Sequence, residues 1–304
     1  MATFLGVPYA ALPVNNLRFM PPKNHTPWTS IRTATQFSKR CMQATGNLVA
    51  FPLPLMSRSL MSEDCLYLNV FTMNLNSSML QPVMFWIHGG AFVVGSSVTY
   101  TSSMMLGFVK RGVVVVSINY RLNVFGFFTT QTAGGNQLIP GNMGLKDQIT
   151  ALQWVRTNIA NFGGDPSQIT VWGESAGSAS TSILTLSPLA NGIFSKAIMQ
   201  SASAFNPWPI DGMAYNFKPT SSLVASNLSC ATMNNWQAGK LNGLLPCLQA
   251  IEAFALLNRT LGITGGAYAW SPVVDGTGGV IPTWPRILGQ AKAQYADANW
   301  INTR

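Results

Sequence analysis

ITVWGESAG, residues 169–177, is the stretch of sequence that decides the fold. An apolar run leads into a Gly-x-Ser-x-Gly pentapeptide, a pattern that predicts a strand followed by a sharp turn into a helix. Gly173 and Gly177 would let two backbone segments pass closely, so that Ser175 takes a strained conformation with its hydroxyl above the sheet. The free N–H groups at the start of the helix would favour a developing oxyanion. The stretch therefore predicts a serine nucleophile for acyl transfer.

The sequence on either side of this stretch predicts an α/β fold. Short apolar runs of strand type alternate with segments of helical spacing, with strands expected at 83–88, 113–118, 169–172 and 197–200 and helices at 147–160 and 176–186. Such alternation predicts a mostly parallel central sheet with helices on both faces. The first 80 residues carry many prolines and short β-like pieces, which predicts an antiparallel N-terminal edge. No internal repeat or linker is visible, so we expect a single domain over residues 1–304.

The composition argues against several classes of protein. Of the 304 residues, 47% are hydrophobic, which is enough for one large core. The net charge of +9 reflects a shortage of carboxylates, because 18 Lys and Arg accompany only 9 Asp and Glu. The basic residues are scattered without interleaved aromatics, so we expect no nucleic-acid binding. We see no apolar run near the roughly 20 residues that span a bilayer, and no signal-peptide pattern at the start.

The four cysteines fall into two local pairs, Cys41 with Cys65 and Cys230 with Cys247. If both pairs close, each would stabilise the fold by about 3 kcal/mol in the loop-entropy model. Four unrelated buried thiols are the alternative, as in a cytosolic chain, so the cysteines alone leave the compartment open. Sequons are about as frequent as chance gives and support secretion only weakly; they begin at Asn24, Asn76, Asn227 and Asn258.

A second glycine-containing loop, His88-Gly89-Gly90-Ala91-Phe92, directly follows the strand expected at 83–88. Its glycines would let backbone N–H groups approach a substrate oxygen, and the residue after the serine, Ala176, would supply a further N–H. An ordinary Gly-Gly turn is the alternative. The serine elbow later in the same alternating sheet favours the oxyanion loop.

In its motifs the chain resembles the type-B carboxylesterases, the α/β-hydrolase group that includes cholinesterases and related adhesion proteins. The matching segments are FLGVPYA at 4–10, LRF at 17–19, SEDCLYLN at 62–69, HGGAF at 88–92, NYR at 119–121, GNMGLKDQ at 141–148, FGGDP at 162–166, GESAG at 173–177, QS at 200–201 and PVVDG at 272–276. The resemblance implies an α/β-hydrolase fold and a secreted or membrane-attached ester hydrolase. It also implies two disulfides and one structural ion pair: Cys41–Cys65, Cys230–Cys247 and Arg18–Glu63.

The resemblance carries roles to individual positions. It implies Ser175 as the nucleophile, Gly90, Ala91 and Ala176 as oxyanion-hole donors, Glu174 as a buried acid beside the serine, and Trp208 as an aromatic of the acyl pocket. A plain core tryptophan is the alternative for Trp208. We expect a small-molecule carboxylic ester as substrate, with choline esters second, because the only aromatic between Cys41 and Cys65 is Phe51 and the position nearest the family's choline-binding tryptophan is Leu55 or Met56. No cofactor or metal is expected, and the oligomeric state is open.

The chain lacks a base for the serine. In α/β-hydrolases the acid and then the histidine follow the nucleophile. The two histidines, His25 and His88, both precede Ser175, and we expect structural roles for them. None of the later acids is assigned as the triad acid; they are Asp211, Glu252, Asp275 and Asp297.

From the resemblance we expect a chain truncated at both ends, with the C-terminal part of the fold missing. We therefore expect residues 1–304 to be nearly inactive alone and the complete parent to be an esterase that acts through an acyl-enzyme. A non-catalytic adhesion or binding domain of the same fold is the alternative, which the retained serine and glycines disfavour.

Overall fold

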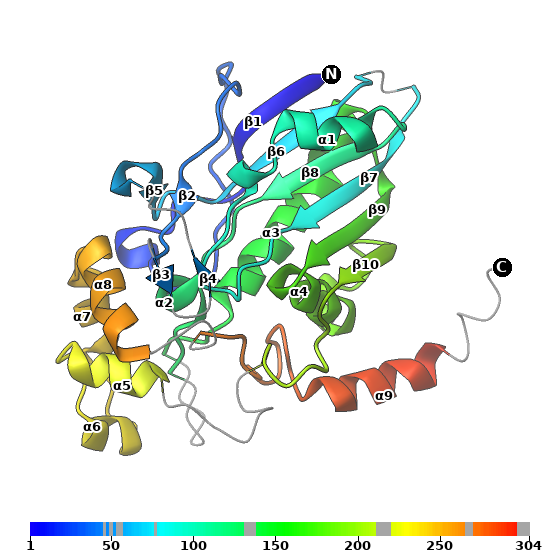
Figure 1. Ribbon diagram of the computed structural model, residues 1–304. Helices are drawn as coiled ribbons and strands as arrows, with labels where there is room; N and C mark the ends of the chain where they lie inside the picture. Colours follow the sequence, from blue (N-terminus) through cyan, green and yellow to red (C-terminus); the bar gives the residue numbers. More distant parts are fainter. Residues whose placement is uncertain are drawn as a thin grey trace.

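A six-stranded sheet forms the centre of the computed structural model, which describes residues 1–44, 47–48, 51–52, 57–75, 78–130, 138–210, 220–264 and 270–296. The strands run in the order β1 (Ala2–Pro8), β6 (Tyr67–Thr72), β8 (Val114–Ile118), β7 (Gln81–Ile87), β9 (Gly164–Glu174) and β10 (Lys196–Gln200). The pairs from β8 to β10 are parallel, and β1 and β6 are added antiparallel. The predicted parallel sheet with an antiparallel N-terminal edge is confirmed (Figure 1).

Helices cover both faces of this sheet, as predicted. On one face, α1 (Ser102–Val109) buries Met105 and Val109 against β6 and β8. On the other, α3 (Met143–Asn158) and α4 (Ala176–Leu186) pack on the main core (Figure 1). Because successive side chains of a strand point to opposite faces, neighbours such as Val115 and Val116 of β8 belong to the two different cores.

The boundaries of the elements differ from the sequence prediction mainly at β9. Gly163, with φ 79°, closes the short 3₁₀ turn Ile159–Phe162 that follows α3. The strand, however, already begins at Gly164, where it pairs with Gln81 of β7. The helix expected at 147–160 begins earlier, at Met143, after the left-handed Asn142. Pairing with β7 therefore sets the start of the strand, whereas the left-handed Asn142 precedes the start of the helix.

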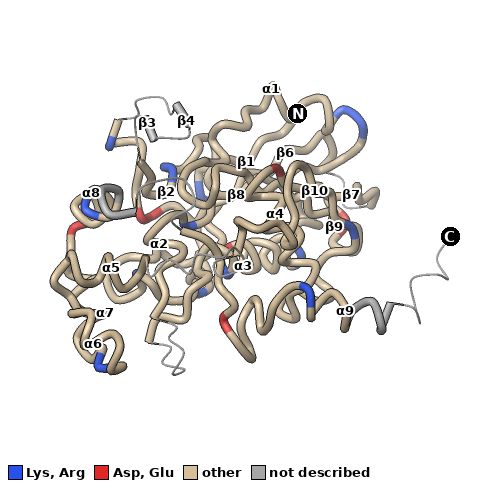
Figure 2. Tube along the Cα trace, turned by 60° about the horizontal axis from the view of Figure 1, so that its bottom comes forward, with Lys and Arg blue, Asp and Glu red and all other residues tan. Residues whose placement is uncertain are grey.

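Smaller elements complete the described chain. Two short sheets pair β2 (Arg40–Cys41) with β5 (Met61–Ser62), and β3 (Asn47–Leu48) with β4 (Phe51–Pro52). The remaining α-helices are α2 (Asn123–Phe127), α5 (Thr220–Asn227), α6 (Met233–Gln237), α7 (Leu244–Ala250), α8 (Ala253–Thr264) and α9 (Pro285–Ala296). Helices α5 to α8 gather at one end of the molecule, and charged residues are sparse and scattered over the trace (Figure 2).

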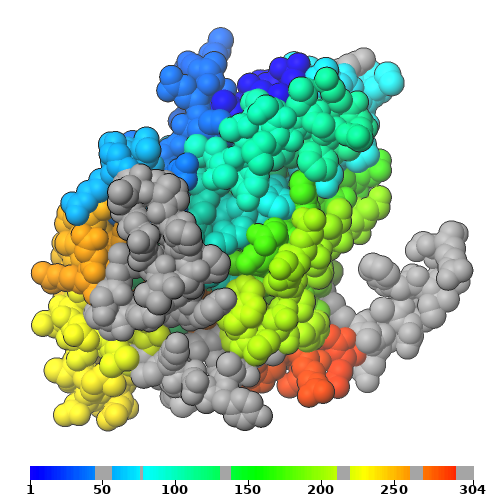
Figure 3. Space-filling view, viewed as in Figure 1, coloured from blue at the N-terminus to red at the C-terminus, as the bar shows by residue number. Residues whose placement is uncertain are grey.

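The N-terminal segment and α7 are held together by Arg18. Its guanidinium binds both carboxylate oxygens of Glu63, with Nε–Oε1 2.6 Å and Nη2–Oε2 2.5 Å, which confirms the expected ion pair. Its third nitrogen donates to carbonyl groups at the end of α7, those of Leu248, Gln249 and Ile251. A cation at a helix C-terminus is stabilising. The blue and orange parts of the chain accordingly lie side by side (Figure 3).

Both expected disulfides are present, Cys41–Cys65 and Cys230–Cys247. The first lies beside the ends of β2 and β5, and the second joins the segment after α5 to α7. Four unrelated thiols, the alternative considered from sequence, are therefore excluded.

Strand β10 is the outer strand of the described sheet, and all five of its residues are exposed. Ile198 and Met199 are each 42% exposed, although one neighbour strand, β9, pairs with them. Apolar side chains on an open strand edge favour association with other chains.

We expect Ile198→Lys with Met199→Lys to reduce self-association without loss of stability. Lysine on an edge opposes strand pairing, and surface substitutions usually change stability by less than about 0.5 kcal/mol. Light scattering and thermal unfolding would measure the two effects. The control is Met73→Lys with Leu75→Lys, at residues 51% and 53% exposed, which adds the same charge elsewhere. Equal self-association of the two variants would contradict the role of the edge.

Candidate active site

Ser175 occupies a strained turn between β9 and α4. Its backbone has φ 54° and ψ −121°, a region that L-residues rarely enter, and the residue is half-buried. Its N–H donates to the Gln200 carbonyl of β10 at 2.9 Å, and its carbonyl accepts from Ala179 at 2.9 Å, the first bond of α4. The elbow predicted from the sequence is therefore formed, with the serine at the start of a helix.

The two flanking glycines allow this turn because nothing larger fits. A Cβ built on Gly177 would lie 2.0 Å from the Ile87 carbonyl oxygen at the end of β7. A Cβ on Gly173 would lie 2.3 Å from the Gly177 carbonyl carbon. Real Cβ contacts do not occur at such distances, so the elbow and the end of β7 approach each other as closely as backbone permits.

The loop at 88–92 is also strained. Gly90 has φ 109°, and the two residues after it, Ala91 and Phe92, have φ 53° and 63° although neither is glycine. The Gly90 carbonyl accepts from the N–H groups of Val93 and Val94, each at 3.0 Å. This turn holds consecutive left-handed residues in place, as is common at functional sites.

The structure brings this loop and the serine together. A Cβ built on Gly89 would lie 3.1 Å from the Cβ of Ser175 and 2.7 Å from the Glu174 carbonyl oxygen. Ala176, the third candidate donor, is fully buried at the first position of α4. A hydroxyl, a strained glycine loop and the N-terminus of a helix thus meet at one point, an arrangement suited to attack on a carbonyl group and to binding of the resulting oxyanion.

His88 lies beneath the loop as a buried, neutral ring. Its Nδ1 lies 2.8 Å from the Gly89 carbonyl oxygen, so the neutral ring donates from Nδ1, and its face stacks on Tyr120 with centroids 4.4 Å apart. Nε2 is buried and has no hydrogen-bond partner among the described residues. Burial lowers the pKa of His88 to about 4. Its contacts support the structural role expected from the sequence.

His25 and two of the later acids are also accounted for by structural contacts. His25 packs edge-on against Trp28 in the N-terminal segment, with its Nδ1 2.6 Å from the Thr26 carbonyl oxygen. Glu252 accepts from the first N–H groups of α8, and these bonds lower the pKa of its carboxyl. Asp275 is buried and accepts from Val280 and Ile281. Asp211 and Asp297 lie outside the described residues.

Glu174 and Trp208 border the site in different ways. The resemblance implies a buried acid at 174, but Glu174 is exposed. It is the last residue of β9, and the only strand that pairs with it is the outer strand β10. Its Oε2 would lie 2.8 Å from a Cβ on Gly89, so its carboxylate stays beside the loop. Trp208 is partly buried, with its ring 6.1 Å from that of Phe92 in the loop. That contact fits a pocket wall as well as the core role considered from sequence.

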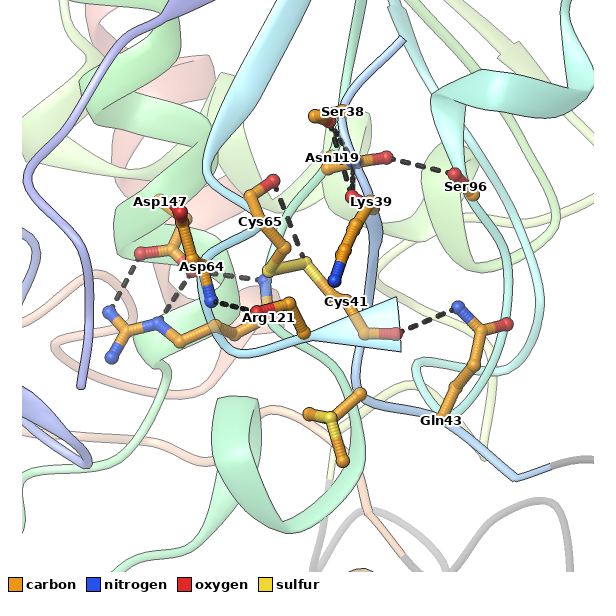
Figure 4. The surroundings of a disulfide bond; sticks show 12 residues. Ser38, Lys39, Cys41, Gln43, Asp64, Cys65, Ser96, Asn119, Arg121 and Asp147 are labelled. Carbon is orange, nitrogen blue, oxygen red and sulfur yellow. Dashed lines mark hydrogen bonds and ion pairs between the residues drawn. A yellow bond between two sulfur atoms is a disulfide. The ribbon is translucent and has the colours of Figure 1, made fainter. Parts of the chain in front are cut away.

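Three amide side chains that no sequence pattern indicated bind backbone groups of the segment after the loop and of the segment around Cys41. Gln43 binds both backbone groups of Gly95, Asn119 accepts from the N–H of Ser97, and Asn123 donates to the Met42 carbonyl. All three are buried, and Figure 4 shows Gln43 and Asn119 near the Cys41–Cys65 disulfide. Side chains that bond to distant backbone produce no periodic pattern, so no signal in the sequence pointed to them.

The fold and the elbow define an α/β hydrolase, and comparison with known proteins gives the family. The profile described as "Carboxylesterase family" matches residues 1–303. The chain is 39% identical to Gut esterase 1 of Caenorhabditis briggsae over 274 residues, which are 90% of this chain and 46% of that protein. It is 40% identical to Carboxylesterase 1E of Mus musculus over 267 residues, 86% of this chain and 45% of that protein.

A third relative is Acylcarnitine hydrolase of Mus musculus, 42% identical over 238 residues, which are 77% of this chain and 41% of that protein. The chain belongs to the carboxylesterase family, a family of carboxylic ester hydrolases. It spans less than half the length of these relatives.

Within the described ranges, we find no helix both long and apolar enough to cross a membrane.

We expect Gly177→Ala to destabilise the fold by roughly 2 to 3 kcal/mol, because the added methyl must displace the Ile87 carbonyl or the first turn of α4. Urea unfolding would measure the change. Gly243→Ala is the control, since nothing lies within 4 Å of a Cβ there. If Gly177→Ala were as stable as Gly243→Ala, the close approach would not constrain the elbow.

We expect His88 to make stability depend on pH between about 6.5 and 4. The pKa of its ring is about 4 in the fold against an ordinary 6.5, so the unfolded chain binds more protons in this range. The contribution is fully present above pH 6.5 and falls by about 3 kcal/mol as the pH drops to 4. Unfolding free energy against pH would show it, and His88→Phe, which keeps a stacking ring, should lack this component. Equal pH slopes for the two proteins would contradict the assignment.

Proposed function

We propose that Ser175 is the nucleophile of a carboxylic ester hydrolase that works through an acyl-enzyme, with N–H groups of Gly90, Ala91 and Ala176 as its oxyanion hole. The observation that carries the proposal is the position of Ser175, strained at φ 54° before α4 and next to Gly89, which leads into the left-handed residues 90–92. Strain of this kind is retained where it serves a site. Membership of the carboxylesterase family supports the same chemistry.

In the proposed reaction, Ser175 Oγ attacks the carbonyl carbon of the ester while its proton passes to a base. The carbonyl oxygen becomes an oxyanion, to which the three N–H groups donate. The C–O bond to the alcohol then breaks, the alcohol takes the proton, and Ser175 is left acylated. Water repeats the sequence, releasing the acid and restoring the serine. Each oxyanion donor is expected to stabilise the transition state by about 3 to 4 kcal/mol.

Neither imidazole of this chain is proposed as the base. His88 is turned to the Gly89 carbonyl and to Tyr120, and His25 to Thr26 and Trp28. With its pKa near 4, His88 would also be a weak proton acceptor. We therefore propose that residues 1–304 alone retain only what binding and the oxyanion hole supply, roughly 10³ to 10⁴ over water.

The substrate class and setting follow from the same argument. We propose small carboxylic esters as substrates, with choline esters as the second choice. Trp208 and Glu174 are proposed as residues of the substrate pocket. The positions that would distinguish choline esters, Leu55 and Met56, lie outside the described residues. The two disulfides support a secreted or extracellular protein. The sequon asparagines Asn24, Asn227 and Asn258 are exposed, which supports a glycoprotein. We propose that residues 1–304 form one partial α/β-hydrolase domain.

Two measurements test the proposal. Purified residues 1–304 should hydrolyse 4-nitrophenyl acetate at no more than roughly 10⁴ times the rate in water, and Ser175→Ala should remove that activity. In the longest product of the same gene, a fluorophosphonate should add to Ser175 and turnover should reach enzyme-like rates. Ser178→Ala, on the buried side of α4, is the control for labelling at the neighbouring serine.

Two outcomes would contradict the proposal. Enzyme-like turnover by residues 1–304 that depends on Ser175 would show that the chain holds its own base. Absence of labelling in the longest product would instead favour the adhesion or binding alternative, in which the elbow is a relic of the fold.

A further inference from the structure

The side chain of Gln43 is bonded to the backbone of a residue 52 positions away. Its Nε2 donates to the Gly95 carbonyl at 2.9 Å, and its Oε1 accepts from the Gly95 N–H at 3.0 Å. Nε2 also donates to the Cys41 carbonyl at 3.0 Å, and the residue is only 2% exposed. A carboxamide presents one donor and one acceptor side by side, and Gly95 uses both.

Gly95 is the residue that lies against the stem of the oxyanion loop. Its φ is 115°, and a Cβ there would lie 2.4 Å from Nδ1 of His88 and 2.5 Å from the Gly89 carbonyl oxygen. Those two atoms are themselves 2.8 Å apart. The position of Gly95 therefore limits where His88 and Gly89 can lie, and the two candidate donors, Gly90 and Ala91, follow directly in the chain.

The segment that carries Gln43 is itself anchored. Cys41 is bonded to Cys65, and Asn123 donates to the Met42 carbonyl at 2.7 Å. Asn119 joins this segment to the residues that follow Gly95, with its Nδ2 3.1 Å from the Lys39 carbonyl oxygen and its Oδ1 accepting from Ser97 N–H at 2.9 Å. Figure 4 shows Lys39, Gln43 and Asn119 near the disulfide.

We propose that Gln43 is a positioning residue for the oxyanion loop, and that the Cys41–Cys65 disulfide anchors it. This inference rests on the proposed function, since it assigns the loop a geometry that ester hydrolysis requires. In this proposal the oxyanion hole is positioned by Gln43, a side chain that contacts neither the substrate nor Ser175. A shift of about 1 Å in such donors is enough to lower catalysis greatly.

Backbone amide exchange in residues 93–97 tests the proposal without any need for catalysis. Gln43→Met keeps the length of the side chain and removes its hydrogen bonds, so exchange there should become roughly tenfold faster or more, the loss of about one hydrogen bond. Gln249→Met is the matched control, because Gln249 also holds two backbone groups, the carbonyls of Asn16 and Arg18. It should leave 93–97 unchanged.

The disulfide supplies a second variant if Gln43→Met does not fold. Cys41→Ser with Cys65→Ser should accelerate exchange in the same residues, whereas Cys230→Ser with Cys247→Ser should not. Exchange in α3 serves as the internal reference, since a merely structural loss would accelerate it as much as the loop.

Binding of phenylboronic acid adds a readout of the oxyanion geometry. Ser175 Oγ adds to boron and loses its proton to water, which leaves a four-coordinate anionic adduct that places a boron-bound oxygen toward the loop. Gln43→Met should weaken this binding roughly tenfold, Gln249→Met should not, and Ser175→Ala should abolish it.

The two readouts separate the two claims. If the unaltered protein binds no boronic acid, the proposed function loses support, and amide exchange alone decides the role of Gln43. Exchange in 93–97 within twofold of the unaltered protein in both Gln43→Met and the Cys41, Cys65 variant would overturn the inference. Equal acceleration over the whole chain would also overturn it, because Gln43 would then support the fold and not the loop.

Discussion

The steric fit between the last carbonyl group of β7 and the first turn of α4 is the constraint on which the site depends. Gly177 presses its Cα against the Ile87 carbonyl so closely that no side chain can intervene. The end of one strand and the elbow of the next are thereby forced into contact, and the loop after β7 must leave across the face of Ser175. This contact forces Ser175, Ala91 and Phe92 into strained, positive-φ conformations, which the buried sheet around them stabilises.

Neutral amide side chains satisfy several of the buried backbone groups in the described part of the chain. Only 9% of residues are charged, and buried ion pairs such as Arg121–Asp147 are accompanied by amide side chains that bind backbone. Gln43 binds both groups of Gly95, and Asn142 binds both groups of Val273, at 2.7 and 2.8 Å. An amide side chain can form hydrogen bonds to a buried peptide group without carrying a net charge. Burying a charge costs far more free energy than burying a neutral amide.

The parts that could be predicted from the sequence are those with a local signature. Apolar runs and glycines identified the parallel strands, α4 and the elbow at Ser175, because burial and close approach restrict the residue type at each position. The exposure of Glu174 could not be predicted, since it depends on which strand lies beside β9. The role of Gln43 was equally hidden, because its partner is remote in sequence and is a backbone group that any residue carries.

The bond between the Ser175 N–H and the Gln200 carbonyl links the strained turn to the outermost strand of the described sheet. Outer strands open locally at lower free energy than the rest of a domain, since few contacts oppose their fraying. Each such opening would release the amide of the serine and let its backbone relax. On heating, the backbone of the elbow would therefore lose its strained conformation at temperatures where the rest of the described sheet is still folded.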